Sequence, residues 1–509
     1  MKSRTFDAVS SRFNLLWYTK IVMIDNLKRN IYWILLVFIG ILGFALRLKG
    51  LISNPSMWHD ECALAWNVIN NSYGELFGKL RFLQVAPPMF MVVSKILVTI
   101  FHVKNHIFAC DFVLRLTPFF FGTLSIGAFY LVCKSLFKSR WTTLIGVLLF
   151  CLNPVLINYC FEFKPYILDV FCVLSALWIF LNTDFQTNTT KKVLIYGCLL
   201  AILPWFSFMS TMVIFAGFMA LSFKREKPKN FFLMFTPIFL SAFLYLKLYV
   251  LNAYEQSSTG MIGFWQNEFV KHDLSNITQL NMDNLHYFFS NLPMFSCTLL
   301  SLLMLVGIIL MFKDRNWRFI LISVLTQASL IIASILHVYP YSRRLIIFLI
   351  PFILIFAVKI FDIKNKVLAG ILLSLIVIPH SLFAVNFTKI SNFNKGDFAR
   401  EMMIKMEKEI RSDETIVINE SSNAEFCYYD LFFSMKQNKV FLKPKNKSEF
   451  AINTELNKLT KGKYWLYMPY DYSPKQQEIK TMIKWAENHS NIIFKTQATQ
   501  STLIKLTLR

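Results

Sequence analysis

The sequence has few charged residues. Of its 509 residues, 16% are Asp, Glu, Lys or Arg, against roughly 25% in an ordinary soluble protein. This shortage excludes a soluble globular enzyme and a disordered chain. Hydrophobic residues make up 55% of the sequence, and the mean hydropathy is +0.48. The composition therefore indicates a polytopic membrane protein.

Acidic residues are the scarcer charged group, with 30 Asp and Glu against 53 Lys and Arg and a net charge of +23. In a membrane protein, such an excess is expected in loops on the inner side and near anionic headgroups. No basic, aromatic-rich soluble module is present, so nucleic acid is not an expected partner. The nine cysteines include no CxxC pair. Residues 1–30 lack a small-residue cleavage site, so we expect the first span to serve as the membrane signal.

Apolar stretches occur along the first three quarters of the chain, and a helical span takes about 20 residues. They lie near 31–51, 86–103, 112–133, 141–160, 166–182, 193–208, 209–223, 231–251, 290–312, 319–338, 343–361 and 367–388. The 193–223 region contains Pro204, and we interpret it as two short spans joined by a tight turn around Ser207–Ser210.

The 86–103 stretch decides the orientation. It starts at Pro87-Pro88, carries Lys95 and is short. If it lies in the outer interface, about 11 spans remain, and the basic loops 134–140, 183–192, 224–230, 313–318 and 362–366 all fall inside. The positive-inside rule favours this arrangement, which places the C-terminus outside.

Residues 390–509 are polar and change character. Strands are predicted at Thr415–Asn419, Lys439–Leu442, Tyr464–Met468, Ile492–Lys495 and Thr502–Leu508, and helices at Asp397–Ile410, Asn423–Phe433 and Pro474–Asn488. We therefore expect a transmembrane domain over 1–389 and a small α/β domain over 390–509. The latter shows no Gly-rich phosphate loop.

Three unusual groups share the predicted outer face. They are Trp58-His59-Asp60-Glu61; Glu162, Lys164, Tyr166 and Asp169; and Tyr339-Pro340-Tyr341-Ser342-Arg343-Arg344. A carboxylate pair at a membrane surface tends to hold a proton or a cation. The alternative is a helix start, with Asp60 as the cap and Glu61 in the first turn.

Asp169 falls inside the start of a predicted span, where an unpaired charge would cost about 2.5–3.5 kcal/mol. We expect it to face the bundle and pair with Lys164 or an arginine, either as a structural ion pair or with a direct role. Arg343 and Arg344 suit a phosphate, or they extend toward lipid headgroups. Adjacent side chains on a helix point about 100° apart, so we expect only one to reach a given ligand.

The order of these motifs resembles the GT-C membrane glycosyltransferases, in particular the family 39 type, the dolichyl-phosphate-mannose–protein mannosyltransferases and the aminoarabinose transferases. The matching segments are Trp58–Glu61, Ala86–Pro88, Asp111–Pro118 (DFVLRLTP), Asn153–Asp169 (NPVLINYCFEFKPYILD) and Arg343–Pro351 (RRLIIFLIP). Two departures stand out: Gln84-Val85-Ala86 where many relatives have a basic residue before Pro-Pro, and Ala63 where the aminoarabinose transferases have a basic residue.

The resemblance implies a GT-C fold, here of about 11 transmembrane helices with an outer-face juxtamembrane helix and the small α/β domain. It also implies transfer of a sugar from a polyprenyl-phosphate donor to an acceptor hydroxyl, in a bacterial cytoplasmic (inner) membrane. The acceptor could be a protein, a lipid or a glycan. Asp60 would be the general base of an inverting displacement.

The remaining roles follow from the same resemblance. Asp60, Glu61 and Asp169 are the candidate catalytic residues, Lys164, Arg343 and Arg344 the candidate phosphate ligands, and Trp58, His59, Glu162, Tyr166 and Tyr341 the candidate substrate contacts. Glu61 positions the acceptor or binds a divalent cation if the reaction uses one; no other cofactor is expected. The alternatives are a lipid-linked glycan polymerase or ligase, a transporter or flippase, and a membrane scaffold that presents residues 390–509.

Overall fold

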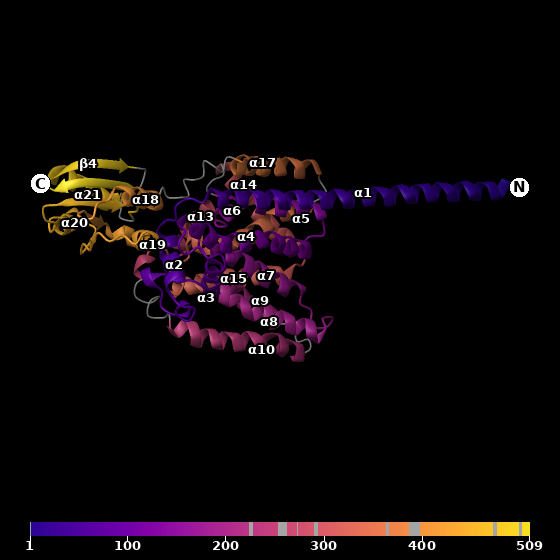
Figure 1. Cartoon of the computed structure of the whole chain (residues 1–509). Coiled ribbons are helices and arrows are strands. Elements are labelled where there is room, and N and C mark those ends of the chain that lie inside the picture. The colour runs from indigo at the N-terminus through magenta and orange to yellow at the C-terminus, as the bar shows by residue number, and fades with distance from the viewer. Residues whose placement is uncertain are drawn as a thin grey trace.

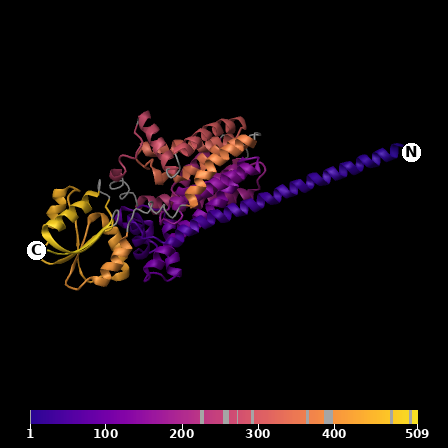
Figure 2. The ribbon, with the colours of Figure 1, turned by 90° about the horizontal axis from the view of Figure 1, so that it is seen from above.

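A computed structural model of the chain describes residues 2–222, 228–252, 262–271, 273–289, 294–362, 366–385, 398–471, 476–497 and 501–508. Figure 1 shows a bundle of helices with a small sheet-containing domain at one end. The first helix runs along the bundle and extends past its other end, so the two termini lie far apart (Figure 2).

The helices of the bundle follow one another with short connections. They are α1 (Lys2–Ser53), α2 (His59–Asn70), α3 (Pro88–Ile100), α4 (Ile107–Leu136), α5 (Arg140–Leu152), α6 (Pro154–Asn158), α7 (Tyr166–Asn182), α8 (Thr190–Phe206), α9 (Ser210–Ser222), α10 (Pro228–Tyr245), α12 (Ile262–Phe264), α13 (Leu274–Phe288), α14 (Met294–Lys313), α15 (Trp317–Ile335), α16 (Ile350–Val358) and α17 (Lys366–Val385). Shorter helical turns are η1 (Glu75–Phe77), η2 (Arg81–Leu83), η3 (Leu246–Val250), η5 (Arg343–Leu349) and η6 (Lys359–Asp362).

Within the described residues, five helices are long and apolar enough to cross a membrane: Leu27–Ser53, Ile107–Leu136, Pro228–Val250, Trp317–Ile335 and Arg343–Asp362. Shorter apolar helices accompany them, including Arg140–Leu152 and Tyr166–Asn182. The number of spans, about 11, and the interfacial position of α3 stay predictions. The predicted turn at Ser207–Ser210 is confirmed, because α8 ends at Phe206 and α9 begins at Ser210.

Close helix contacts hold the bundle together. α1 packs on α4 and α5, α4 on α7, α8 on α10, and α14 on α16. At the α14–α16 contact, a Cβ on Gly307 would lie 1.7 Å from the carbonyl oxygen of Phe356. Only glycine fits there, in keeping with the small residues that let membrane helices approach closely.

The C-terminal domain has a five-stranded sheet. Its strands are β1 (Thr415–Ile418), β2 (Asn438–Phe441), β3 (Lys463–Met468), β4 (Ser490–Gln497) and β5 (Thr502–Leu508), and its helices are α18 (Ala399–Glu409), α19 (Asn423–Phe433), α20 (Glu449–Leu456) and α21 (Gln477–His489), with the turn η8 (Glu420–Ser422). The strand order is β2-β1-β3-β5-β4, with β2, β1 and β3 parallel and the other two pairings antiparallel.

All five predicted strands are confirmed to within two residues at each end, and three of the four helices were predicted. The sequence analysis missed α20. The first residues of two predicted helices, at 397 and 474–475, and the predicted boundary at 389/390 lie outside the described residues.

The two faces of the sheet bury different side chains. Ile416 and Ile418 of β1 belong to the core that continues into the bundle, whereas Val417 belongs to a second core with Met482 of α21. This alternation follows from the two-residue repeat of a strand. The sheet therefore has one face toward the bundle, covered by α18 and α19, and one face covered by α20 and α21.

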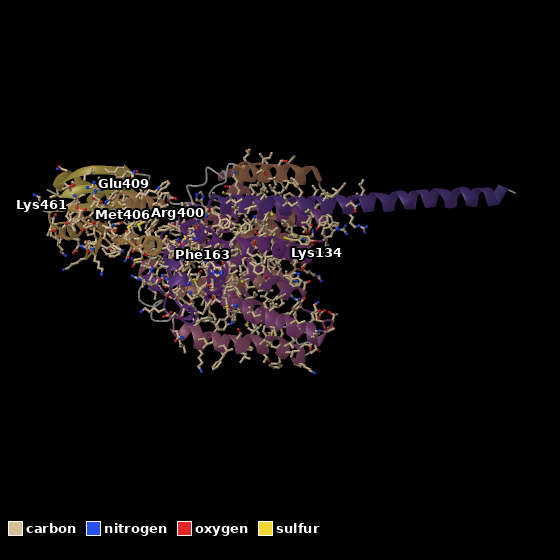
Figure 3. The ribbon with its side chains drawn as sticks, viewed as in Figure 1. Lys134, Phe163, Arg400, Met406, Glu409 and Lys461 are labelled. Atoms are coloured by element: carbon tan, nitrogen blue, oxygen red, sulfur yellow. The ribbon has the colours of Figure 1, made fainter. Side chains whose placement is uncertain are left out.

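A buried polar cluster joins the C-terminal domain to the bundle. The carboxylate of Asp111, on α4, lies 2.9 Å from Nη1 of Arg400 and accepts hydrogen bonds from the hydroxyls of Tyr428 (2.7 Å) and Tyr429 (3.3 Å). Arg400 also donates to the carbonyl oxygen of Asn54 at 2.9 Å. Figure 3 shows Arg400 at this junction, with Lys134 toward the opposite end of the bundle.

We expect Arg400→Met to weaken this junction strongly. Removing one partner of a buried ion pair leaves the other charge uncompensated, which costs about 3–5 kcal/mol. Thermal unfolding of the purified protein in detergent measures the loss. The control is Lys405→Met on the same helix, because Lys405 pairs with Glu409 at 3.9 Å on the surface, where a pair contributes about 1 kcal/mol or less. Equal effects of the two substitutions would contradict the prediction.

Candidate functional site

The site is built on the start of α2. Trp58 precedes the helix, and Glu61 accepts a hydrogen bond from the Trp58 amide at 3.4 Å, which forms a capping box. The expectation that Asp60 is the cap is therefore wrong: Asp60 is the second residue of the helix. Since Trp58 and Glu61 close the helix end, the Asp60 carboxylate is available for contacts across the site.

Glu61 forms a buried ion pair with Arg115 of α4. Its two oxygens accept hydrogen bonds from Nε (2.9 Å) and Nη2 (2.8 Å) of Arg115, and both residues are almost fully buried. Arg115 also donates to the carbonyl oxygen of Pro55 at 2.6 Å, and Glu61 accepts from the Phe163 amide at 2.6 Å. The pair thus fixes the loop before α2 and the segment before α7 to one point of α4. Its contacts give Glu61 a positioning role.

Asp60 meets two cations from distant parts of the chain. Its Oδ2 lies 2.9 Å from Nη1 of Arg344 and 3.9 Å from Nζ of Lys164. Asp60 and Arg344 keep 17% and 18% of their side-chain surface exposed, whereas Lys164 keeps 5%. A ligand can therefore reach Asp60 and Arg344, while the lysine lies deeper. Lys164 also donates to Oε1 of Gln84 at 2.8 Å.

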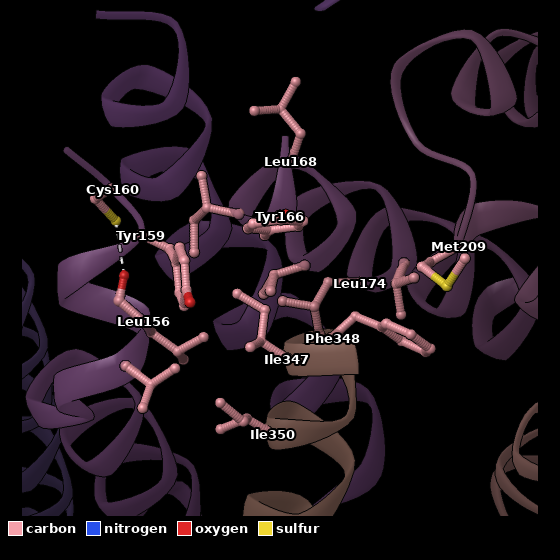
Figure 4. Packing of buried hydrophobic residues seen from close by; sticks show 14 of the residues in the cluster. Leu156, Tyr159, Cys160, Tyr166, Leu168, Leu174, Met209, Ile347, Phe348 and Ile350 are labelled. Atoms are coloured by element: carbon pink, nitrogen blue, oxygen red, sulfur yellow. Dashed lines mark hydrogen bonds between the residues drawn. The ribbon is translucent and has the colours of Figure 1, made fainter. Parts of the chain in front are cut away.

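Aromatic rings surround Arg344. Its guanidinium carbon lies 5.2 Å from the ring centroid of Trp58, 5.5 Å from that of Trp265 and 6.0 Å from that of Tyr166. Such contacts hold a guanidinium group in place without neutralising its charge. η5 packs on α7 beneath them, and Figure 4 shows Tyr166 and Ile347 in this apolar layer.

Burial and neighbouring charges shift two pKa values. Burial lowers the pKa of Lys164 to about 8, against the attraction of Asp60 and with a contribution from Arg344. Glu162 also acts on Lys164 electrostatically, which places its carboxylate near the same group. Burial alone would lower the pKa of His59, but the charge and hydrogen bond of Glu425 outweigh it and raise that pKa above its ordinary value.

Three predicted residues have other contacts. Asp169 accepts a hydrogen bond from the hydroxyl of Ser207 at 2.6 Å, and none of the ion pairs among the described residues includes it. The expected pairing of Asp169 with Lys164 or an arginine is wrong, because the α8–α9 turn brings a hydroxyl to it first. Tyr341 is buried and donates to Asn281 at 2.6 Å.

Arg343 points to a different place from its neighbour. It lines a cavity of about 170 Å³ with mostly polar walls, formed by Asn267, Glu268, Asn276, Gln279, Leu280, Asp283 and Asn284. The expectation that only one of the two arginines reaches a given ligand agrees with this arrangement, and the arginine beside Asp60 is Arg344. Among the described residues, no group of three or more His, Cys, Asp or Glu side chains could hold a metal ion.

The sequence analysis gave no site role to several residues that organise the site: Asp111, Arg115, Gln84, Glu425 and Arg400. For Asp111 and Arg115 a signal existed, since both are charges four residues apart in an otherwise apolar helix. The other three lie in polar or mixed segments, where an extra polar residue is unremarked.

We expect the buried pair to depend on the shape of the arginine as well as on its charge. Arg115→Met leaves Glu61 uncompensated and should cost about 3–5 kcal/mol of unfolding free energy. Arg115→Lys keeps the charge but loses the two-pronged contact, so it should cost less. Chemical unfolding in detergent compares them; a methionine variant as stable as the lysine variant would show that the charge is unimportant.

Comparison with known proteins comes from sequence and structure. A family model described as a domain of unknown function (DUF6311) matches residues 87–283. No curated protein sequence matches the chain.

Two crystal structures of ArnT from Cupriavidus metallidurans are similar to the chain. The one bound to undecaprenyl phosphate has a TM-score of 0.56 at 9% identity and covers 93% of this chain and 98% of that chain. The apo structure has a TM-score of 0.53 at 9% identity, with coverage of 91% and 97%. At this identity, the likeness concerns the fold. The chain thus has the GT-C fold of membrane glycosyltransferases, as the order of its motifs predicts.

Proposed function

We propose that the protein is a membrane glycosyltransferase that moves a sugar from a polyprenyl-phosphate donor to an acceptor hydroxyl. The observation that carries this proposal is the partly exposed carboxylate of Asp60 between Arg344 and Lys164. The similar ArnT structure contains undecaprenyl phosphate, which supports a donor of this class. The reaction would take place at the outer face of a bacterial cytoplasmic membrane, with residues 1–389 as the catalytic domain and residues 390–509 outside.

The charges of the site favour an anionic donor. Asp60 contributes one negative charge, and Lys164 and Arg344 contribute two positive charges, so these three groups have one positive charge in excess. A donor phosphate would compete with Asp60 for the guanidinium group and the ammonium group. Its binding therefore frees the Asp60 carboxylate at the moment when a base is needed.

The chemistry is a single displacement. Asp60 accepts the proton of the acceptor hydroxyl while the hydroxyl oxygen attacks the anomeric carbon. The bond between that carbon and the phosphate oxygen breaks, and configuration is inverted. The leaving lipid phosphate gains negative charge, which Lys164 and Arg344 stabilise in a partly desolvated site. Glu61 positions Asp60 through its contacts with Arg115.

The rings around Arg344 and the polar cavity at Arg343 give the remaining contacts a division of labour. Trp58 and Tyr166 hold the phosphate-binding arginine and offer ring faces to a sugar. The cavity at Arg343 offers amides and carboxylates, which suit hydroxyl groups of the sugar or of the acceptor. A ligase or polymerase acting on lipid-linked glycans would use the same centre with a longer donor.

We expect Asp60→Asn to remove transfer while donor binding remains. The amide keeps the shape of the carboxylate but cannot accept the proton, and general-base catalysis contributes about 10²–10⁴-fold. The assay supplies purified protein with radiolabelled polyprenyl-phosphate monosaccharides and follows sugar release. Glu75→Gln, in the exposed turn η1, is the matched control. An Asp60→Asn variant within a few-fold of wild type would refute Asp60 as the base, and turnover of lipid-linked oligosaccharides alone would favour the ligase alternative.

We expect transfer to fail at alkaline pH because Lys164 loses its proton. A pKa of about 8 means that the ammonium form dominates below pH 8 and disappears above it. The pH profile of kcat/KM, which reports the free enzyme, should fall across this range. Lys164→Arg stays charged and should move the fall to higher pH, whereas Lys79→Arg in an exposed loop should not. An unchanged fall in Lys164→Arg would assign it to another group.

A further inference from the structure

One face of α19 in the C-terminal domain reaches the loop that carries Asp60. Glu425, Tyr428 and Tyr429 are spaced i, i+3 and i+4, so they lie on the same side of the helix. The Tyr429 hydroxyl accepts a hydrogen bond from the Met57 amide at 2.8 Å. Glu425 Oε2 lies 3.1 Å from Nδ1 of His59. The C-terminal domain therefore contacts the residue next to Asp60.

Glu425 is a buried carboxylate with few partners. Its side chain is fully buried, and its Oε1 makes no hydrogen bond within the described part of the chain. Among the ion pairs of the described residues, Glu425 contacts His59. A buried charge without compensation is costly, so this carboxylate favours a positively charged imidazole. The His59 ring is also held by stacking on Tyr470, with centroids 5.2 Å apart and planes at 19°.

The groups that face His59 come from three elements. Glu425 on α19 and Asp60 on α2 favour its protonated form, and Lys164, in the segment before α7, opposes it. The two carboxylates outweigh the one ammonium group. His59 is therefore placed to act as a cation within the same cluster as Lys164 and Arg344.

We propose that Glu425 is a positioning residue of the transfer site: it holds His59 as an imidazolium beside Asp60, which gives the site a third cation for the anionic donor. This inference rests on the proposed function. It assigns the C-terminal domain a part in binding the donor phosphate, in addition to any contact with an acceptor. The alternative is that the pair only attaches the domain, and pH separates the two.

The binding test uses the full-length protein in detergent and undecaprenyl phosphate as the probe, with the dissociation constant measured at pH 5.5 and pH 7. Glu425→Gln keeps the shape but lets His59 lose its proton earlier. We expect it to bind roughly tenfold more weakly than wild type at pH 7, as for one lost charge several ångströms from a phosphate, and to recover at pH 5.5. His59→Gln should bind weakly at both pH values. Asp430→Asn is the control, because Asp430 is on the same helix but pairs with Lys439 at 2.6 Å.

Two results would overturn the inference. Glu425→Gln could bind like wild type at both pH values, or it could be weakened by the same factor at both, which is the behaviour of a purely structural contact. Absence of binding by the wild type would overturn it too. Binding needs no turnover, so a wild type that binds the probe with the expected pH dependence but transfers no sugar would refute the proposed reaction alone.

Thermal unfolding without ligand checks the charge of the pair independently. The pKa of His59 is raised in the folded protein, so the pair stabilises the fold at low pH, and this contribution is lost as pH rises through that pKa. Glu425→Gln should lack this step, and Asp430→Asn should keep it. A step that persists in Glu425→Gln would show that Glu425 does not control the charge of His59.

Discussion

The ion pair between Glu61 and Arg115 is the contact on which the rest of the site depends. Both groups are removed from water, where an unpaired charge is expensive, and the two-pronged geometry allows little freedom. Through the carbonyl of Pro55 and the amide of Phe163, the same pair holds the loop before α2 and the segment before α7. Asp60 and Lys164 are the next residues along these two segments, so their separation is set by a neighbouring contact.

The helix α4 is a common reference for the site and for the C-terminal domain. Asp111 lies four residues, about one helical turn, before Arg115, so both side chains leave the same side of the helix. One receives Arg400 and two tyrosines of the C-terminal domain, and the other receives Glu61. Because a helix is stiff, the position of α19 relative to Asp60 is defined without a direct contact between them. This arrangement explains why charged residues are kept in an otherwise apolar span.

Much of the fold could be predicted from the sequence, because local patterns carry it. The strands of the C-terminal domain alternate apolar residues, and the turn between α8 and α9 has serines next to a long apolar run. The site could be predicted in part: Asp60, Lys164 and Arg344 meet as their motif order implies. The partners of Glu61, Asp169 and His59 could not, because Arg115, Ser207 and Glu425 come from distant segments and no periodicity links them. The choice between Arg343 and Arg344 depended on the irregular turn η5, where Arg343 has a positive φ of 34°.

The site balances its charges before any ligand arrives. Arg344 and Lys164 are costly to desolvate alone, and Asp60 compensates them in the ligand-free protein. An anionic ligand replaces one favourable contact by another, so the protein exchanges partners for its cations and does not have to bury new charges. The aromatic rings keep Arg344 in place during that exchange, since a cation–π contact persists whichever anion the guanidinium group faces. A base held in reserve by its own phosphate ligands becomes available only when a phosphate displaces it, which couples deprotonation of the acceptor to the presence of the donor.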